Sequence, residues 1–229
     1  MIRRTLTVTG LCAGLLLSAS ALALSLGDLS QKDASGGLKD ALSQGAQIAV
    51  KQLGTPGGFS NNPDVRIELP GNLGKVAKKM KQFGMGAQVD ELETSMNKAA
   101  EAAVPQAQAI LLDAVKKMTV DDAKGILSGG KDSATQYLSK TSREQIREKF
   151  LPIVKSATDK VGVAQKYNQF AGQAASFGVV DQKSANIEGY VTEQALNGLF
   201  EMIGKQEASI RENPAAAATS LAKKVFGAL

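Results

Sequence analysis

The stretch Ser128–Ser133 (SGGKDS) holds the residue types and spacing most suggestive of chemistry. It fits the S-G-G-x-D-S pyrophosphate loop of enzymes that adenylate their substrates with ATP. Together with Gly125 it also approximates a Walker-type phosphate loop. Ser128 and Lys131 form the S-x-x-K pattern of penicillin-interacting serine enzymes. Each chemistry needs particular structural elements around the string, so those elements decide among the three.

The surroundings of the string favour none of the three chemistries. An adenylating loop needs a buried strand directly upstream, whereas residues 118–127 (MTVDDAKGIL) predict a capped helical turn. Asp132 stands where a Walker loop needs a magnesium-binding Ser or Thr, and its charge would repel phosphate. The serine-enzyme motif lacks its later partner motifs at suitable positions. We therefore expect a glycine corner between two helices, with Asp132 or Ser133 capping a short second helix.

The composition removes most catalytic systems. The chain contains no histidine and one cysteine, Cys12, which lies in the apolar N-terminal stretch. Ser-His-Asp catalysis, Cys-His catalysis and imidazole zinc sites are therefore excluded, and we predict no metal site and no cofactor. The enzymatic alternative that stays open is a histidine-free hydrolase. It would use a Ser-Lys pair or carboxylates such as Asp121, Asp122 or Glu207.

The N-terminus predicts a secretory leader. Arg3 and Arg4 precede an apolar stretch over about residues 6–17, and an A-x-A cleavage site ends at Ala23. No later stretch approaches the ~20 apolar residues of a membrane-spanning helix. We expect a leader at 1–23, a periplasmic mature chain that forms one helical domain over 24–229, and no transmembrane segment after cleavage. Oligomeric state is left open.

The charge pattern gives no sign of nucleic-acid binding. The formal net charge is +5, but the basic residues are scattered singly or in pairs among acidic ones. Aromatic residues make up 4% of the chain and tryptophan is absent. A nucleic-acid surface would cluster basic residues with aromatic ones, so we predict no nucleic-acid partner.

Apolar residues recur with helical spacing along most of the chain, which predicts an all-α fold, a compact multi-helix bundle. The helix at 186–213 is apolar around so much of its circumference that we expect it at the centre. Pro152 should kink the helix that contains it, and Thr141 or Ser142 should cap that helix. The expected helices cover residues 38–53, 88–103, 105–118, 120–127, a short stretch after 133, 143–161, 186–213 and 221–229.

Residues 54–71 interrupt the helical pattern. Turn-forming residues fill the first half, and alternation of apolar and charged residues then predicts one short extended or strand segment near 65–69. Residues 177–181 (FGVVD) are the other strand candidate. Long irregular loops commonly carry function, so we place the ligand or partner site here, on the residues Phe59, Asn61, Asn62, Arg66 and Glu68.

Arg211 is a further candidate near the end of the 186–213 helix. At i, i+4 from Glu207 it could form a surface ion pair. It could instead hold a loop or a partner's carboxylate, because Pro214 ends the helix close by. Both interpretations stay open at this point.

Several stretches resemble a bacterial family catalogued as domain of unknown function 4197. They include GLKDALSQGAQIAVKQL, GGFSNNPDVRIELP and YVTEQALNGLFEMIGKQEASIRENP, and they cover nearly all of the mature chain. The resemblance implies an exported, mainly helical protein and implies no enzyme activity. We expect a non-catalytic periplasmic module that binds an apolar, lipid-like ligand or an envelope protein. The alternatives are the histidine-free hydrolase and a ligand-free envelope scaffold or stress factor.

Overall fold

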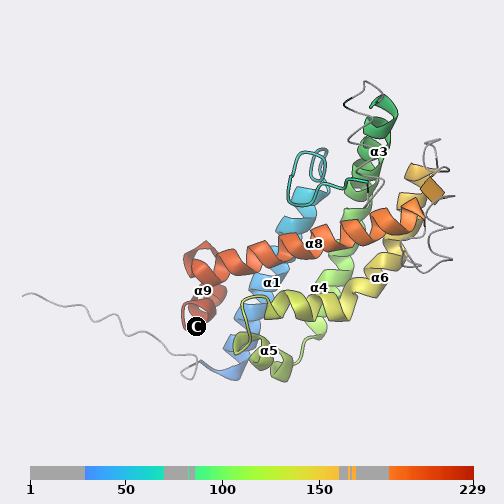
Figure 1. The fold of residues 1–229 in the computed structure, drawn as a ribbon. Helices are drawn as coiled ribbons and strands as arrows, with labels where there is room; N and C mark the ends of the chain where they lie inside the picture. Colours follow the sequence, from blue (N-terminus) through green and yellow to red (C-terminus); the bar gives the residue numbers. More distant parts are fainter. Residues whose placement is uncertain (1–28, 70–81, 83–85, 160–164, 166, 169–185) are drawn as a thin grey trace, which may run out of the picture.

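The computed structural model describes residues 29–69, 82, 86–159, 165, 167, 168 and 186–229, and its regular structure there is entirely helical (Figure 1). This confirms the expected all-α bundle. The α-helices are α1 (Gln31–Leu53), α3 (Ala87–Ala103), α4 (Ala107–Lys117), α5 (Val120–Leu127), α6 (Ser133–Thr158), α8 (Ile187–Glu212) and α9 (Ser220–Phe226). Two 3-10 turns, η2 (Val104–Gln106) and η4 (Pro214–Ala216), follow α3 and α8.

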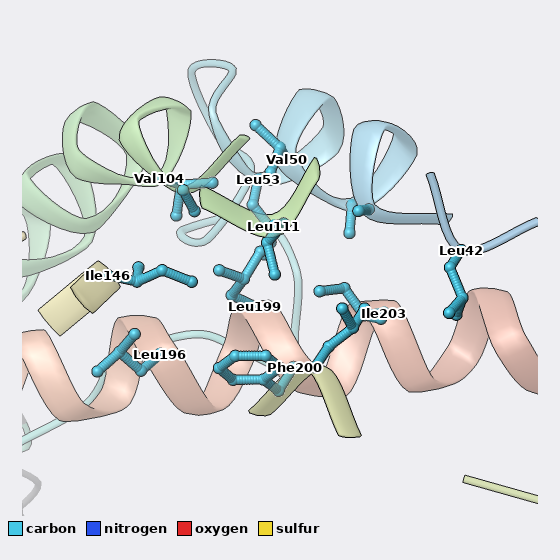
Figure 2. Packing of buried hydrophobic residues seen from close by; sticks show 14 of the residues in the cluster. Leu42, Val50, Leu53, Val104, Leu111, Ile146, Leu196, Leu199, Phe200 and Ile203 are labelled. Carbon is cyan, nitrogen blue, oxygen red and sulfur yellow. The ribbon is translucent and has the colours of Figure 1, made fainter. Parts of the chain in front are cut away.

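Helix α8 buries most of its apolar residues, but Asn197, Glu201, Lys205 and Ser209 form an exposed stripe, so it is not enclosed at the centre as the sequence suggests. It packs most extensively against α6 and also contacts α1 and α3. Figure 2 shows Leu199 and Ile203 of α8 on the side that faces Leu111 of α4. Burying a side chain of this size stabilises the fold by roughly 1.5–3 kcal/mol. The apolar residues of α8 that are buried are Ile187, Val191, Ala195, Leu196, Leu199, Phe200, Ile203 and Ile210.

The N-terminal half of α1 makes a close contact with α9. A Cβ atom at Gly37 would lie 2.6 Å from Val225 Cγ2 and 2.7 Å from the carbonyl oxygen of Leu221. The glycine is therefore required for the approach of the two helices. The other end of α1 stops at Gly54, as the sequence predicts, and leads into the long loop. The 54–69 loop and α9 thus lie at opposite ends of α1 (Figure 1).

Helix α5 begins at the residue that the sequence indicates. Thr119 accepts a hydrogen bond from the backbone N–H of Asp122, and the Asp122 carboxylate accepts one in return from Thr119 N at 2.8 Å. This reciprocal pair is a capping box. The hydrogen bonds from the Thr119 backbone and hydroxyl lower the pKa of Asp122.

The prediction of a helix start at Thr141 or Ser142 is wrong, and so is the short helix before it. Helix α6 runs without a break from Ser133 to Thr158 and includes Pro152. The hydroxyl groups of Thr141 and Ser142 donate to the carbonyl oxygens of Tyr137 and Leu138, one helical turn earlier. A Ser or Thr hydroxyl can cap a helix N-terminus or donate to a carbonyl oxygen within a helix. The buried apolar face of α6 favours the continuous helix.

The 65–69 segment forms no strand within the described residues. It is irregular, and both backbone groups of its Ile67 bond to a side chain of α3, as described below. The other strand candidate, 177–181, lies outside the described residues. A polar side chain has thus taken the place of a neighbouring strand.

Candidate functional site

The 54–69 loop is anchored in the core by Phe59, whose side chain is 0% exposed. The ring packs against α8 where Gly198 leaves space for it. A Cβ atom at position 198 would lie 2.9 Å from Phe59 Cε1 and 3.1 Å from Val65 Cβ. Phe59 is therefore a packing anchor. The expectation that it contacts a ligand finds no support in its position.

A buried glutamate of α3 holds the backbone next to this anchor. Glu101 Oε1 accepts hydrogen bonds from Phe59 N at 3.1 Å, Ser60 N at 3.2 Å and Ser60 Oγ at 3.1 Å. Hydrogen bonds to a charged acceptor contribute ~1.5–3 kcal/mol each. The carboxylate fixes the turn at residues 59 and 60 because both consecutive N–H groups converge on one oxygen.

One helical turn earlier, Asn97 holds the second half of the loop. Its Oδ1 accepts from Ile67 N at 2.9 Å, and its Nδ2 donates to the carbonyl oxygens of Ile67 at 2.8 Å and Glu93 at 2.7 Å. The carboxamide thus satisfies both backbone groups of Ile67, as a neighbouring strand would. Asn97 is 1% exposed, so these bonds are formed away from water.

Further contacts fix the end of the loop. Tyr190 of α8 donates its hydroxyl to the carbonyl oxygen of Glu68 at 2.8 Å. Burial, with smaller effects of the Glu68 and Glu93 charges, raises the pKa of Tyr190 to about 12. The phenol therefore keeps its proton and its hydrogen bond at neutral pH. The Arg66 guanidinium lies 3.8 Å from Glu93 and donates to the carbonyl oxygen of Ser60 at 3.3 Å.

The row Glu93, Asn97 and Glu101 was missed in the sequence, although a signal for it exists. These residues recur every four positions, beside the apolar stripe of α3, and all three are buried. A polar row at helical spacing that borders a buried stripe indicates hydrogen bonding to another segment. The partner segment could not be read from the spacing, because it lies 41 residues away from Glu101 in the chain.

The loop presents its polar side chains outward. Asn61, Asp64, Arg66 and Glu68 are exposed, and Asn62 is half-buried. A hollow of about 360 Å³ lies beside them; it is lined by Gln52, Thr55, Pro56, Gly57, Gly58, Asn61, Asn62 and Met202. Gly57 has a φ of 86°, a conformation that favours glycine. Of the predicted site residues, Asn61 and Asn62 line this hollow, while Phe59 does not.

Arg211, the remaining candidate, belongs to a different cluster at the corner between α5 and α6. It donates to Glu207 Oε1 through Nε at 3.0 Å and through a terminal nitrogen at 2.9 Å. The same nitrogen donates to Ser133 Oγ at 3.1 Å and to the carbonyl oxygen of Ile126 at 3.3 Å. The guanidinium also lies over the Phe226 ring, 5.7 Å from its centroid. Arg211 therefore forms the expected i, i+4 ion pair with Glu207, although the pair is largely buried and not on the surface, and the same guanidinium also holds the corner between α5 and α6.

Glu207 occupies the helix N-terminus that follows the SGGKDS string. Its carboxylate accepts from Ala134 N at 3.1 Å, Thr135 N at 2.8 Å and Thr135 Oγ1 at 2.7 Å, at the first turn of α6. Asp132, the N-terminal flanking residue, makes no such cap. The string thus leads into a helix N-terminus that binds an anion, as a phosphate loop does, but the anion is the protein's own glutamate.

The carboxylates named for a histidine-free hydrolase, and Ser128 of the Ser-Lys pair, each have a structural partner of their own. Asp121 is highly exposed and lies 3.7 Å from Lys124; Asp122 belongs to the α5 capping box, and Glu207 to the α6 cap. Ser128 donates its hydroxyl to the carbonyl oxygen of Lys124 at 2.8 Å. Within the described ranges, no cluster of three or more Asp, Glu, His or Cys side chains is arranged to bind a metal.

Comparison with known proteins identifies the family. A family model described as "Protein of unknown function (DUF4197)" matches residues 28–227, so the chain belongs to this family. No curated protein and no solved structure matches it. In the part of the chain that the structure describes, none of the helices has the length and apolarity to cross a membrane.

Proposed function

We propose that this DUF4197 protein is an exported, non-catalytic module that binds another envelope protein through its 54–69 loop. One observation carries the proposal. The buried α3 side chains Glu101 and Asn97 hold the backbone of the loop, while the loop's own polar side chains are exposed to solvent. A loop fixed before binding loses little conformational entropy when a partner docks. Buried hydrogen bonds under an irregular exposed loop are what such a binding surface requires.

A protein partner fits this surface better than an apolar ligand does. Phe59 is enclosed by the core, and the neighbouring hollow is lined largely by carboxamide, hydroxyl and backbone groups. The exposed charged residues of the loop, Asp64, Arg66 and Glu68, include both signs. Mixed polar surfaces of this kind are typical of the rim of protein interfaces. The ligand-free scaffold is the second candidate, and it predicts that no partner contacts the loop.

Export is a part of the proposal that the predicted leader supports. The family match begins at residue 28, after the expected cleavage site at Ala23. Fractionation of the native host, followed by N-terminal sequencing, should place the protein in the periplasm with Leu24 as its first residue. A cytoplasmic chain that still begins with Met1 would contradict this part.

Site-specific photocrosslinking in the native host tests the binding function. A photoreactive amino acid at Arg66 should give one discrete crosslinked protein. The matched control is Lys224 on α9, which is exposed and lies at the other end of α1. Adding Glu101→Ala to the Arg66 probe should abolish the crosslink, because the loop then loses the acceptor that fixes it.

Two results would contradict the proposal. One is the absence of a crosslink from the Arg66 position in cells where the protein is abundant. The other is the same set of products from Arg66 and from Lys224, since this would indicate random collision. Either result would favour the scaffold function.

A further inference from the structure

The hollow beside the loop is part of a longer furrow. A second hollow of about 450 Å³ is lined by Gln47, Val50, Lys51, Gly54, Thr55, Pro105 and Gln108. A third, of about 440 Å³, is lined by Ile48, Lys51, Gln52 and Thr55. Thr55 lines all three hollows. They therefore adjoin around the C-terminal end of α1 and extend from the start of α4 to Met202 of α8. We call this tract the α1 furrow.

The α1 furrow is lined by carboxamides whose hydrogen-bonding capacity is largely unused. Within the described residues, the side chains of Gln47, Gln52, Gln108 and Asn61 make no hydrogen bond. Asn62 is the exception, because its Oδ1 accepts from Asp64 N at 3.2 Å and its Nδ2 lies 3.8 Å from Met202 Sδ. Exposed carboxamides with free donors and acceptors are available to a partner.

The side chains that line the furrow carry a single positive charge. Lys51 is its one charged lining residue, and no carboxylate lines any of the three hollows. Between the amides lie apolar side chains such as Ile48 and Pro105. A partner that fits must offer alternating donors and acceptors, small or apolar side chains, and no excess of positive charge.

An extended polypeptide meets these requirements. Its backbone presents an N–H donor and a C=O acceptor at each residue, and a carboxamide can bind both at once, as Asn97 already does with Ile67 in this protein. A small anion would use only the donors, and a small cation only the acceptors. The open shape of the furrow suits a chain that lies along it.

We propose that the α1 furrow binds an extended, neutral to acidic polypeptide segment of the partner, with an acidic side chain or C-terminal carboxylate at Lys51. The carboxamides hydrogen-bond to the backbone of the segment, and the ion pair between Lys51 and the carboxylate determines the direction in which the segment binds. The inference deepens the proposed function and rests on it, since the furrow includes one flank of the 54–69 loop.

Selection from a random library of linear peptides, displayed on phage, tests this inference on the full-length protein purified from its host. Peptides that bind should carry an acidic residue or free carboxylate and should weaken when their backbone amides are N-methylated. Gln52→Ala combined with Gln108→Ala should reduce affinity about tenfold, because the two substitutions remove carboxamides that hydrogen-bond to the peptide backbone. Lys51→Ala should remove the preference for acidic peptides. Gln145→Ala, an exposed amide on α6, is the matched control and should leave affinity unchanged.

Selected peptides that bind the double variant as well as the original protein would overturn the inference. A library that yields no binder would do the same. The photocrosslink from Arg66 separates these failures from failure of the proposed function. If the crosslink persists while the peptide result is negative, the loop binds its partner and the furrow does not contribute. If both are absent, neither proposal stands.

Discussion

Two buried glutamates, Glu101 under the 54–69 loop and Glu207 at the corner before α6, hold irregular backbone in nearly the same way. Each accepts two consecutive backbone N–H groups and the hydroxyl of the second residue, Ser60 or Thr135. They differ in their remaining partners. Glu207 uses both oxygens and is paired with Arg211, whereas Glu101 uses one oxygen and has no cation partner among the described residues.

The difference indicates what each cluster does for the protein. An ion pair that is nearly closed off from water couples the stability of α5, α6 and α8, because removal of either charge leaves the other unpaired. The Glu101 cluster depends on hydrogen bonds to one oxygen. A neutral group could supply that oxygen. The Glu207 cluster therefore contributes more to the free energy of unfolding. The Glu101 cluster contributes less, and its main effect is to hold the loop in one conformation.

Glu207→Gln should have the largest effect. The amide nitrogen would face the donors of either Thr135 or Arg211, and the guanidinium would lose its counter-charge. We expect a loss of about 3–5 kcal/mol in the free energy of unfolding, the range for a broken buried pair, measured by urea denaturation. In a double-mutant cycle with Arg211→Ala, the two losses should be clearly non-additive. Additive losses would show that the ion pair does not act as a unit.

Gly198→Ala should have the next largest effect, and it perturbs the loop through the packing of the Phe59 ring and not through the Glu101 hydrogen bonds. The new methyl group would overlap Phe59 and Val65, and overpacking of this kind costs about 1–3 kcal/mol. Gly204→Ala, in the same helix, is the control because the nearest atom to its new Cβ would be 3.7 Å away. That control should be neutral or stabilising by up to ~1 kcal/mol. Equal effects of the two substitutions would contradict the role of Phe59 as an anchor.

Glu101→Gln should cost less than the other two, about 1–2 kcal/mol, since the amide oxygen can replace Oε1 while the bonds lose their charge assistance. Hydrogen exchange at the amides of Phe59 and Ser60 should accelerate modestly. Glu101→Ala removes the acceptor and should accelerate exchange far more. If Glu101→Gln proved as damaging as Glu207→Gln, the charge of Glu101 would be essential and the comparison would fail.

The sequence predicted those features of the fold that local chemistry determines. Thr119 and Asp122 lie close enough in the chain for the capping box to be evident, and Gly54 marks the end of α1. The error at Thr141 and Ser142 is also local: a hydroxyl can cap a helix or bond within one, and the choice depends on burial that spacing alone does not reveal.

The position of the irregular 54–69 loop was predictable from the sequence, but the contacts that hold it were not. Irregular, turn-rich sequence located the loop, and Asn61, Asn62, Arg66 and Glu68 do lie at or near its surface. The groups that hold the loop, Asn97 and Glu101, come from a helix 30 or more residues later. A backbone N–H has no sequence signature of its own, so its side-chain partner in a distant helix could not be identified in advance.

Glu193 offers the smallest and most selective test, because it is more exposed than Glu101 and Glu207 and pairs with two arginines of α6, Arg143 and Arg147. Burial alone raises the pKa of Glu193, but hydrogen bonds from Arg143 and Arg147 and their charges outweigh burial and lower it below its ordinary value of 4.5. A carboxyl with a lowered folded-state pKa stabilises the protein above pH 4.5, and that contribution disappears as the pH falls through the folded-state value.

Glu193→Gln should therefore be less stable than the original protein at pH 6, and the difference should shrink on acidification. Glu144→Gln is the control, since Glu144 is exposed and lies 3.9 Å from Arg147. A stability difference for Glu193→Gln that stays constant from pH 6 to pH 3 would mean that the two arginines stabilise α6 against α8 through geometry, independently of the charge on Glu193.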